Sequence, residues 1–315
     1  MTPNFAAVFP GQGSQAVGML SALASAFPAV TETFEQASGV LGFDLWRLVQ
    51  EGPIEALNQT ENTQPALLAA GVAVWRVWQA QGGTEPSGMA GHSLGEYTAL
   101  VCAEALGFEE AVALVRDRGR LMQAAVPAGS GGMAAILGLD DDAVRAACAA
   151  AAQGEIVEAV NFNAPGQVVI AGQAAAVQRA IDQAKALGAK RAIPLPVSVP
   201  SHCALMIRAA ALLRERLAAV SVRTPHIPVL HNVNVAPSAT PDELRDLLGR
   251  QLHCPVRWAE TVRCQADAGM TWQLEFGPGK VLTGLGKRID ERVRPLPVFD
   301  PATLTAALEM LHADE

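Results

Sequence analysis

Cysteine is scarce in this sequence of 315 residues, and its distribution excludes two classes of protein. The five cysteines are Cys102, Cys148, Cys203, Cys254 and Cys264, and no two of them form a Cys-x-x-Cys pair. Disulfide scaffolds and structural zinc sites depend on paired or closely spaced cysteines. We therefore expect neither a disulfide framework nor a metal site.

Clustered positive charge and long apolar runs are also lacking. The formal net charge of −8 argues against general affinity for nucleic acid or anionic membranes, because both require clustered lysine and arginine. The strongly apolar stretch at residues 65–75 ends at Arg76, well short of the ~20 residues that span a bilayer. Residues 1–10 carry no basic segment and no apolar core of the kind found in export signals. We therefore expect a cytoplasmic protein that binds neither nucleic acid nor membrane.

The residues that are present indicate a large globular chain. Half of them are hydrophobic (50%) and 17% are charged, which excludes disordered and fibrous classes. At ~100–200 residues per domain, the length allows two ordinary domains or one large domain with an insert.

Residues 130–198 have an order of elements that is complete in itself. Apolar strand patterns and alanine-rich helix patterns alternate there as strand, helix, strand, strand, helix, strand, the ferredoxin-like βαββαβ order. Strands and helices alternate on both sides of this segment, which predicts one α/β domain with a mostly parallel sheet. We therefore predict a large α/β domain formed by residues 1–129 and 199–315, with residues 130–198 inserted as a ferredoxin-like subdomain.

The segment Gly91-His92-Ser93-Leu94-Gly95 fits the Gly-x-Ser-x-Gly nucleophile elbow. In this motif a sharp turn from strand to helix projects the serine Oγ outward, and the next N–H points at the developing oxyanion. An apolar GMAG strand precedes the pentapeptide and a helical pattern follows it, as the motif requires. The pentapeptide alone could be a structural turn; in this context Ser93 is a candidate nucleophile and Leu94 a candidate oxyanion donor.

A serine nucleophile needs a base, and His202 is the best placed of the six histidines. It follows a loop stiffened by prolines and precedes a helical pattern that we extend from His202 to Val220, with Ser201 as a possible cap. The positive end of that helix would lower the imidazole pKa and keep the base neutral. Taken alone, His202 could merely fill a first-turn position. His92 adjoins the serine and is better suited to packing or orientation.

Arg118 provides the clue to the substrate. A helical projection of residues 111–123 places it in the middle of the apolar face. A buried guanidinium is costly unless an anion meets it, and its planar fork matches a carboxylate. Arg118 could form a buried salt bridge with an internal Asp or Glu, or it could bind a substrate that carries its own carboxylate.

Several motifs together resemble those of one enzyme family across nearly the whole chain. They are FPGQGSQ near the start, GHSLGEY, RGRLMQ, NAPGQ, VPSHCALM, and GPGKVLTGL near the end. In this set and order the sequence resembles the malonyl-CoA:acyl carrier protein transacylases of type II fatty acid synthesis. The resemblance implies a hydrolase-like α/β domain with a ferredoxin-like insert, which agrees with the organisation predicted above.

The resemblance also implies a role for each matching residue. Ser93 matches the acylated serine and His202 the catalytic base. The backbone N–H groups of Gln12 and Leu94 match the oxyanion hole, and Arg118 matches the arginine that binds the malonyl carboxylate. Gln251 matches a residue whose backbone carbonyl orients the histidine in place of the aspartate of a hydrolase triad.

The implied reaction is a ping-pong acyl transfer. The malonyl group passes from malonyl-CoA to Ser93, and from there to the phosphopantetheine thiol of acyl carrier protein. Malonyl-CoA is a substrate, and no cofactor or metal is expected. We expect a monomer. Because carrier proteins of this pathway are acidic, a basic docking surface is expected, with Lys190, Arg191, Lys287 and Arg288 as candidates.

Other functions remain open on the sequence alone. A malonyltransferase of polyketide synthesis or malonate decarboxylation would share the serine, histidine and arginine. A serine esterase or thioesterase would pass the acyl group to water, but no acidic residue between Ser93 and His202 stands out as the third member of its triad. A non-catalytic scaffold that binds carrier protein would need neither the nucleophile Ser93 nor the base His202.

Overall fold

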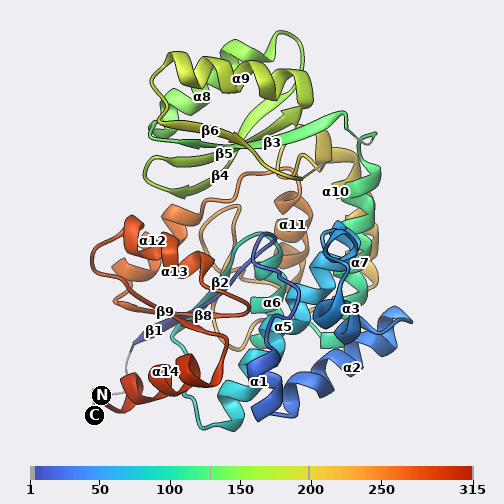
Figure 1. Ribbon diagram of the computed structural model, residues 1–315, viewed down its shortest axis with the longest axis vertical. Helices are drawn as coiled ribbons and strands as arrows, with labels where there is room; N and C mark the ends of the chain where they lie inside the picture. Colours follow the sequence, from blue (N-terminus) through green and yellow to red (C-terminus); the bar gives the residue numbers. More distant parts are fainter. Residues whose placement is uncertain (1–3, 128, 198, 314–315) are drawn as a thin grey trace.

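The protein is described by a computed structural model that covers residues 4–127, 129–197 and 199–313. Two sheets lie one above the other with helices around the larger one (Figure 1). The helices in the described part of the chain are α1 (Ser21–Ala26), α2 (Ala29–Leu41), α3 (Leu45–Glu51), α4 (Ile54–Leu57), α5 (Thr60–Ala80), α6 (Leu94–Cys102), α7 (Phe108–Ala124), α8 (Asp141–Ala152), α9 (Ala174–Ala186), the short 3₁₀ helix η1 (Ala204–Met206), α10 (Ile207–Ala219), α11 (Pro241–Gln251), α12 (Trp258–Asp267), α13 (Val281–Ile289) and α14 (Pro301–Ala313).

The larger sheet is parallel, as predicted. Its strands in the described chain are β1 (Phe5–Phe9), β2 (Gly88–Gly91), β7 (Val229–Leu230), β8 (Trp272–Phe276) and β9 (Arg294–Val298), in the spatial order β7-β2-β1-β8-β9. Every residue of β1 is buried, because this strand lies between β2 and β8 and has covered faces on both sides. The carboxyl ends of β1 and β2 therefore lie side by side, which is where open α/β sheets place their sites.

The second sheet is formed by strands between residues 131 and 194. Its described strands are β3 (Gly131–Leu137), β4 (Val157–Ala164), β5 (Gln167–Gln173) and β6 (Arg191–Pro194), paired antiparallel in the order β4-β5-β3-β6. Helices α8 and α9 cover the face that points away from the larger sheet (Figure 1). Asp140 caps α8 by accepting a hydrogen bond from the N–H of Ala143. The mixed α/β fold class is confirmed; the domain limits at 129/130 and 198/199 stay a prediction, and residue 198 lies outside the described residues.

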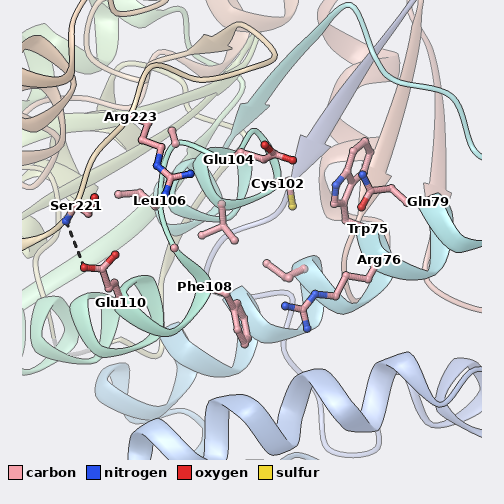
Figure 2. A pocket seen from close by; sticks show the side chains of 14 residues that line it. Trp75, Arg76, Gln79, Cys102, Glu104, Leu106, Phe108, Glu110, Ser221 and Arg223 are labelled. Carbon is pink, nitrogen blue, oxygen red and sulfur yellow. Dashed lines mark hydrogen bonds between the residues drawn. The ribbon is translucent and has the colours of Figure 1, made fainter.

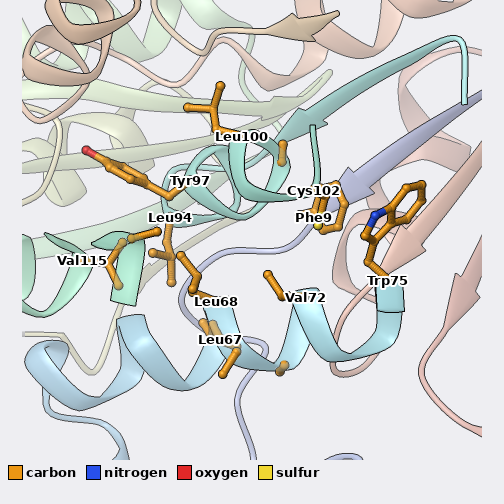
Figure 3. Close-up of a cluster of buried hydrophobic side chains, with 14 of the residues drawn as sticks. Phe9, Leu67, Leu68, Val72, Trp75, Leu94, Tyr97, Leu100, Cys102 and Val115 are labelled. Carbon is orange, nitrogen blue, oxygen red and sulfur yellow. The ribbon is translucent and has the colours of Figure 1, made fainter. Parts of the chain in front are cut away.

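The core of the larger domain forms where α5 and α6 pack against the parallel sheet. In Figure 3, Leu68 and Val72 of α5 lie toward α6, and Leu94 of α6 points toward them. The apolar stretch at residues 65–75 is therefore the buried middle of a helix. Among the helices of the described residues, none has both the length and the hydropathy that crossing a bilayer requires.

Two predicted elements are shorter than the sequence pattern indicates. The sequence of residues 228–235, PVLHNVNV, is typical of a strand. However, β7 ends at Leu230, because Asn232 turns inward to bond the neighbouring strand end and Val235 has a positive φ of 56°. The helix expected from His202 begins only at Ala204, because the φ of His202 is +66°, outside the helical region. Both departures bring side chains to the carboxyl end of β2.

Candidate active site

Ser93 occupies a strained turn between β2 and α6. Its φ and ψ are 50° and −106°, a conformation that L-residues rarely adopt. The turn closes only because glycines flank it. A Cβ at Gly91 would lie 1.9 Å from the carbonyl carbon of Gly95, and one at Gly95 would lie 2.0 Å from the carbonyl oxygen of Phe9. The predicted elbow geometry is therefore present.

His202 reaches Ser93 from a loop more than a hundred residues further along the chain. Its Nε2 lies 2.7 Å from the serine Oγ. Its Nδ1 lies 2.7 Å from the backbone carbonyl oxygen of Gln251, and its own N–H donates to the carbonyl of Leu252. Because a carbonyl only accepts, the proton sits on Nδ1 and leaves Nε2 free to accept the serine proton.

The imidazole of His202 is kept neutral by its surroundings. It is 2% exposed, and burial first, then the positive charge of Arg118, lowers its pKa to about 3. The expected direction of the shift is correct, but the expected cause is not. His202 precedes the helix, and Cys203 rather than Ser201 occupies the N-cap position of η1, so the helix end is not the source.

Arg118 projects from α7 into the site and is 1% exposed. Its Nη1 donates to Oε1 of Gln64 at 2.9 Å. Its Nη2 donates to Oε1 of Gln251 at 3.0 Å and to Oγ of Ser93 at 3.2 Å. The guanidinium also lies over the ring of Tyr97, 5.3 Å from its centroid.

All the hydrogen-bond acceptors of Arg118 are thus neutral. Within the described residues no carboxylate lies within ion-pair distance of it. The alternative of an internal salt bridge is therefore not what the structure contains. Burial lowers the pKa of the guanidinium and the nearby Glu96 raises it, but arginine remains protonated in proteins, so a buried positive charge with no carboxylate in direct contact lies beside the serine hydroxyl.

The candidate oxyanion donors lie in the same cavity. Gln12, Ser93, Leu94, Arg118 and His202 line a space of about 110 Å³, together with Met133 and Asn161 of the smaller sheet. Gln12 reaches it because the chain after β1 passes against the serine turn. A Cβ at Gly11 would lie 2.4 Å from the carbonyl oxygen of His92.

His92 does not face the serine. Its Nε2 lies 2.7 Å from Oδ1 of Asn163 on β4, and its ring packs near that of Trp258. Burial lowers its pKa. His92 therefore links the serine turn to the smaller sheet, in agreement with the predicted packing or orienting position.

Three further residues beside the site are not predicted from the sequence: Glu96, His231 and Asn232, each 0% exposed. Asn232 accepts from the N–H of Ser93 at 2.8 Å and donates to the carbonyl of Gly91 at 2.7 Å. Glu96 accepts from Nδ1 of His231 at 2.7 Å and from the N–H of Asn232 at 2.9 Å. For Glu96 the sequence offers one signal, a charged residue in the apolar stretch after GHSLG. The structure buries this residue in α6.

A second cavity lies at the opposite end of α6. It has a volume of about 390 Å³, and Trp75, Arg76, Cys102, Glu104 and Arg223 are among the side chains around it (Figure 2). No candidate site residue from the sequence lines this cavity. Within the described residues, no group of three or more His, Cys, Asp or Glu side chains is arranged to hold a metal ion.

The fold and the pair of Ser93 and His202 define a class: α/β enzymes with a serine nucleophile on a strand–turn–helix elbow. Comparison with known proteins narrows the class. The family model described as "Acyl transferase domain" matches residues 7–294. Malonyl CoA-acyl carrier protein transacylase of Escherichia coli K12 is 56% identical over 307 residues, covering 98% of this chain and 99% of the relative.

Solved structures agree with this comparison. An acyl carrier protein S-malonyltransferase from Vibrio cholerae has a TM-score of 0.94 at 59% identity, covering 96% of this chain and 99% of the other. A malonyl-transacylase in complex with a type II polyketide acyl-carrier protein has a TM-score of 0.97 at 57% identity, covering 98% and 99%. The chain belongs to the acyl transferase family, and within it to the malonyl-CoA:acyl carrier protein transacylases.

Proposed function

We propose that this protein transfers a malonyl group from malonyl-CoA to the phosphopantetheine thiol of acyl carrier protein, through a malonyl ester on Ser93. The observation that carries the proposal is the buried charge of Arg118 beside the serine hydroxyl, which is hydrogen-bonded only to neutral acceptors among the described residues. A malonyl thioester places its free carboxylate two carbons from the carbon that the serine attacks. An acyl group with this charge supplies the directly bound carboxylate that the buried guanidinium lacks. The names of the relatives support the same substrates.

The first half-reaction forms the ester. His202 Nε2 accepts the Ser93 proton while Oγ attacks the thioester carbon, and the N–H groups of Gln12 and Leu94 stabilise the oxyanion. Collapse of the tetrahedral intermediate breaks the carbon–sulfur bond, and the proton on His202 passes to the CoA sulfur. The carbonyl of Gln251, 2.7 Å from Nδ1, stabilises the imidazolium that forms in between.

The second half-reaction reverses these steps with another thiol. The phosphopantetheine thiol gives its proton to His202 and attacks the malonyl ester through the same oxyanion hole. The proton then returns to Ser93 Oγ as the ester bond breaks. Both steps move an acyl group and a proton without a change of oxidation state, so no redox cofactor is needed. Because the oxyanion hole stabilises the negative charge and His202 activates the nucleophile, we expect no metal either. Full activity after exhaustive dialysis against a chelator would test this expectation.

Mass spectrometry of the intact protein mixed with malonyl-CoA tests the intermediate. We expect a malonyl adduct on wild type that acyl carrier protein discharges rapidly and water slowly, and no adduct on Ser93→Ala. His202→Ala should form the adduct far more slowly. Rapid release of free malonate without transfer would instead support a thioesterase and overturn the proposal.

A setting in polyketide synthesis is the second candidate, and one observation favours it. The similar transacylase noted above was solved with a type II polyketide carrier protein. Malonate decarboxylation uses the same acyl chemistry. Relative rates with carrier proteins from fatty acid and polyketide systems would separate these settings. A cytoplasmic location and a monomeric state also belong to the proposal, and light scattering of the purified protein would test the second.

A further inference from the structure

Gln251 contributes a buried side chain as well as a backbone carbonyl to the site. The residue is 0% exposed, and its amide makes three hydrogen bonds. Oε1 accepts from Nη2 of Arg118 at 3.0 Å, and Nε2 donates to the carbonyl oxygen of Ser93 at 3.0 Å and to Oε2 of Glu96 at 2.8 Å. One amide therefore joins the arginine, the serine turn and a buried carboxylate.

These partners determine which way the Gln251 amide points. A guanidinium only donates hydrogen bonds, whereas a carbonyl and a carboxylate only accept them. Rotation of the amide by half a turn would place Nε2 against Arg118, and Oε1 against the oxygens of Ser93 and Glu96. Each of the three hydrogen bonds would become a repulsive contact, so the amide oxygen must face the arginine.

Glu96 is itself held in place from the other side. Its Oε1 accepts from Nδ1 of His231 at 2.7 Å, and its Oε2 accepts from the N–H of Asn232 at 2.9 Å. Glu96, His231 and Asn232 are each 0% exposed. A carboxylate bound by several buried donors has no freedom to move away from Gln251.

The neutrality of the amide matters for substrate choice. A carboxylate at position 251 would form an internal ion pair with Arg118 and compete with a bound acyl carboxylate. A glutamine instead aims the guanidinium and leaves its charge available. Gln64 binds Nη1 in the same way, through its own amide oxygen at 2.9 Å.

We propose that the side chain of Gln251 is a positioning residue that aims Arg118 at the acyl carboxylate, and that Glu96 sets the orientation of its amide. This inference rests on the proposed function. It concerns selection between malonyl and uncharged acyl groups, separately from the part that the Gln251 carbonyl plays in holding His202.

The substitution Gln251→Leu removes the amide and retains the carbonyl. We expect kcat/KM for malonyl-CoA to fall about 10- to 100-fold, mostly through KM, because a buried charged donor loses its acceptor. Acetyl-CoA has no carboxylate for Arg118 to bind, so its kcat/KM should fall less than that of malonyl-CoA, and the malonyl-to-acetyl ratio should drop. Gln265→Leu is the matched control, because Gln265 is buried and bonds Gln273 away from the site. Its malonyl-to-acetyl ratio should equal that of wild type.

Glu96 is tested by a pair of variants. In Glu96→Gln the amide nitrogen can donate to Nδ1 of His231 if the ring proton moves to Nε2, which makes no hydrogen bond within the described residues. The amide oxygen then still accepts from Gln251, so the malonyl-to-acetyl ratio should be retained. Glu96→Leu should lower the ratio as Gln251→Leu does.

Equal losses for malonyl and acetyl transfer in folded Gln251→Leu would overturn the inference, as would an unchanged ratio. Thermal unfolding establishes whether each variant is folded. If the leucine variant does not fold, Gln251→Asn keeps a polar side chain but withdraws it from Arg118, and the same ratio decides. A wild-type protein that forms no malonyl adduct would refute the proposed function instead, which distinguishes the two failures.

Discussion

At the scale of single residues, the charge of Arg118 is the feature that should distinguish acyl groups. We expect Arg118→Ala to lower malonyl transfer about 100- to 1000-fold, the loss typical of one partner in a buried charged pair. Acetyl transfer should fall less than about tenfold. Initial rates with both CoA thioesters check this expectation. Arg120→Ala is the control, because this arginine lies two residues further along α7 and forms a surface ion pair with Glu61. Equal losses for both substrates in Arg118→Ala would mean that the arginine is structural.

The pH dependence of acylation should report the environment of His202. Its pKa of about 3 in the folded protein lies below the ordinary value of 6.5, so the neutral base persists in acid. We expect kcat/KM for acetyl-CoA, which lacks a titrating carboxylate, to show no acid limb near pH 6.5.

Arg118→Ala provides the matching variant for this pH profile. Removal of the positive charge that helps to lower the pKa should move the acid limb upward, toward 6.5.

The lowered pKa of His202 also makes the stability of the folded protein depend on pH. Because the folded protein disfavours the charged imidazole, His202 contributes stability fully above pH 6.5 and loses it as the pH falls from 6.5 toward 3. A wild-type acid limb centred near 6.5 would contradict this account.

The sequence was informative at the residues whose local pattern carries their chemistry. Ser93 could be predicted because glycine spacing and strand–helix context describe the elbow, and Arg118 because a charge interrupts an apolar helical face. Glu96 and Asn232 could not be predicted in the same way. The two residues bond each other although they lie 136 residues apart along the chain. Helical periodicity and strand alternation describe only neighbouring residues, so they cannot predict this contact.

At the scale of elements, the junction of β1, β2 and α6 depends on glycines that allow backbone to meet backbone. In Gly95→Ala the new Cβ would lie 2.0 Å from the carbonyl oxygen of Phe9, a contact that requires the strand end to move. We expect a loss of about 2 kcal/mol or more in the free energy of unfolding, as in overpacked cores, and a loss of acylation. Denaturant unfolding measures the first effect.

Gly284→Ala is the control for this substitution. Gly284 lies within α13, and a Cβ there would meet nothing within 4 Å. Alanine should therefore leave stability unchanged or raise it by up to about 1 kcal/mol. If Gly95→Ala were as stable and active as Gly284→Ala, the close approach at the elbow would not constrain the protein.

The limits of elements were harder to predict than their existence. The βαββαβ order was confirmed in β3 to β6 because each element has its own apolar period. The start of α10 and the end of β7 were predicted wrongly. At both places the backbone leaves the regular element so that a side chain reaches the site. His202 has a positive φ, and Asn232 bonds the serine turn. These tertiary contacts override the local sequence pattern.

At the scale of the whole molecule, the candidate docking residues come from different elements but gather at one place. Lys190 and Arg191 adjoin Leu137 and Gly138, and Gly138 donates to the carbonyl of Gly166. Gln167, the next residue, accepts from Nη1 of Arg288 in the last turn of α13. Lys190, Arg191, Lys287 and Arg288 are all exposed. We therefore propose that these four side chains form a basic docking patch where the smaller sheet meets α13, on a chain whose net charge is −8.

Charge reversal in this patch should separate the two half-reactions. CoA delivers the malonyl group without a protein surface, so Lys190→Glu with Lys287→Glu should leave formation of the malonyl adduct unchanged. Transfer to an acidic carrier protein should weaken about tenfold through KM and lose its dependence on salt, because exposed charges mainly affect encounter. Stopped-flow transfer at low and high salt measures both. Arg47→Glu with Arg216→Glu changes the net charge equally at exposed positions on α3 and α10, outside the patch. If these control substitutions slowed transfer as much as the patch variant, overall charge rather than a local surface would govern docking.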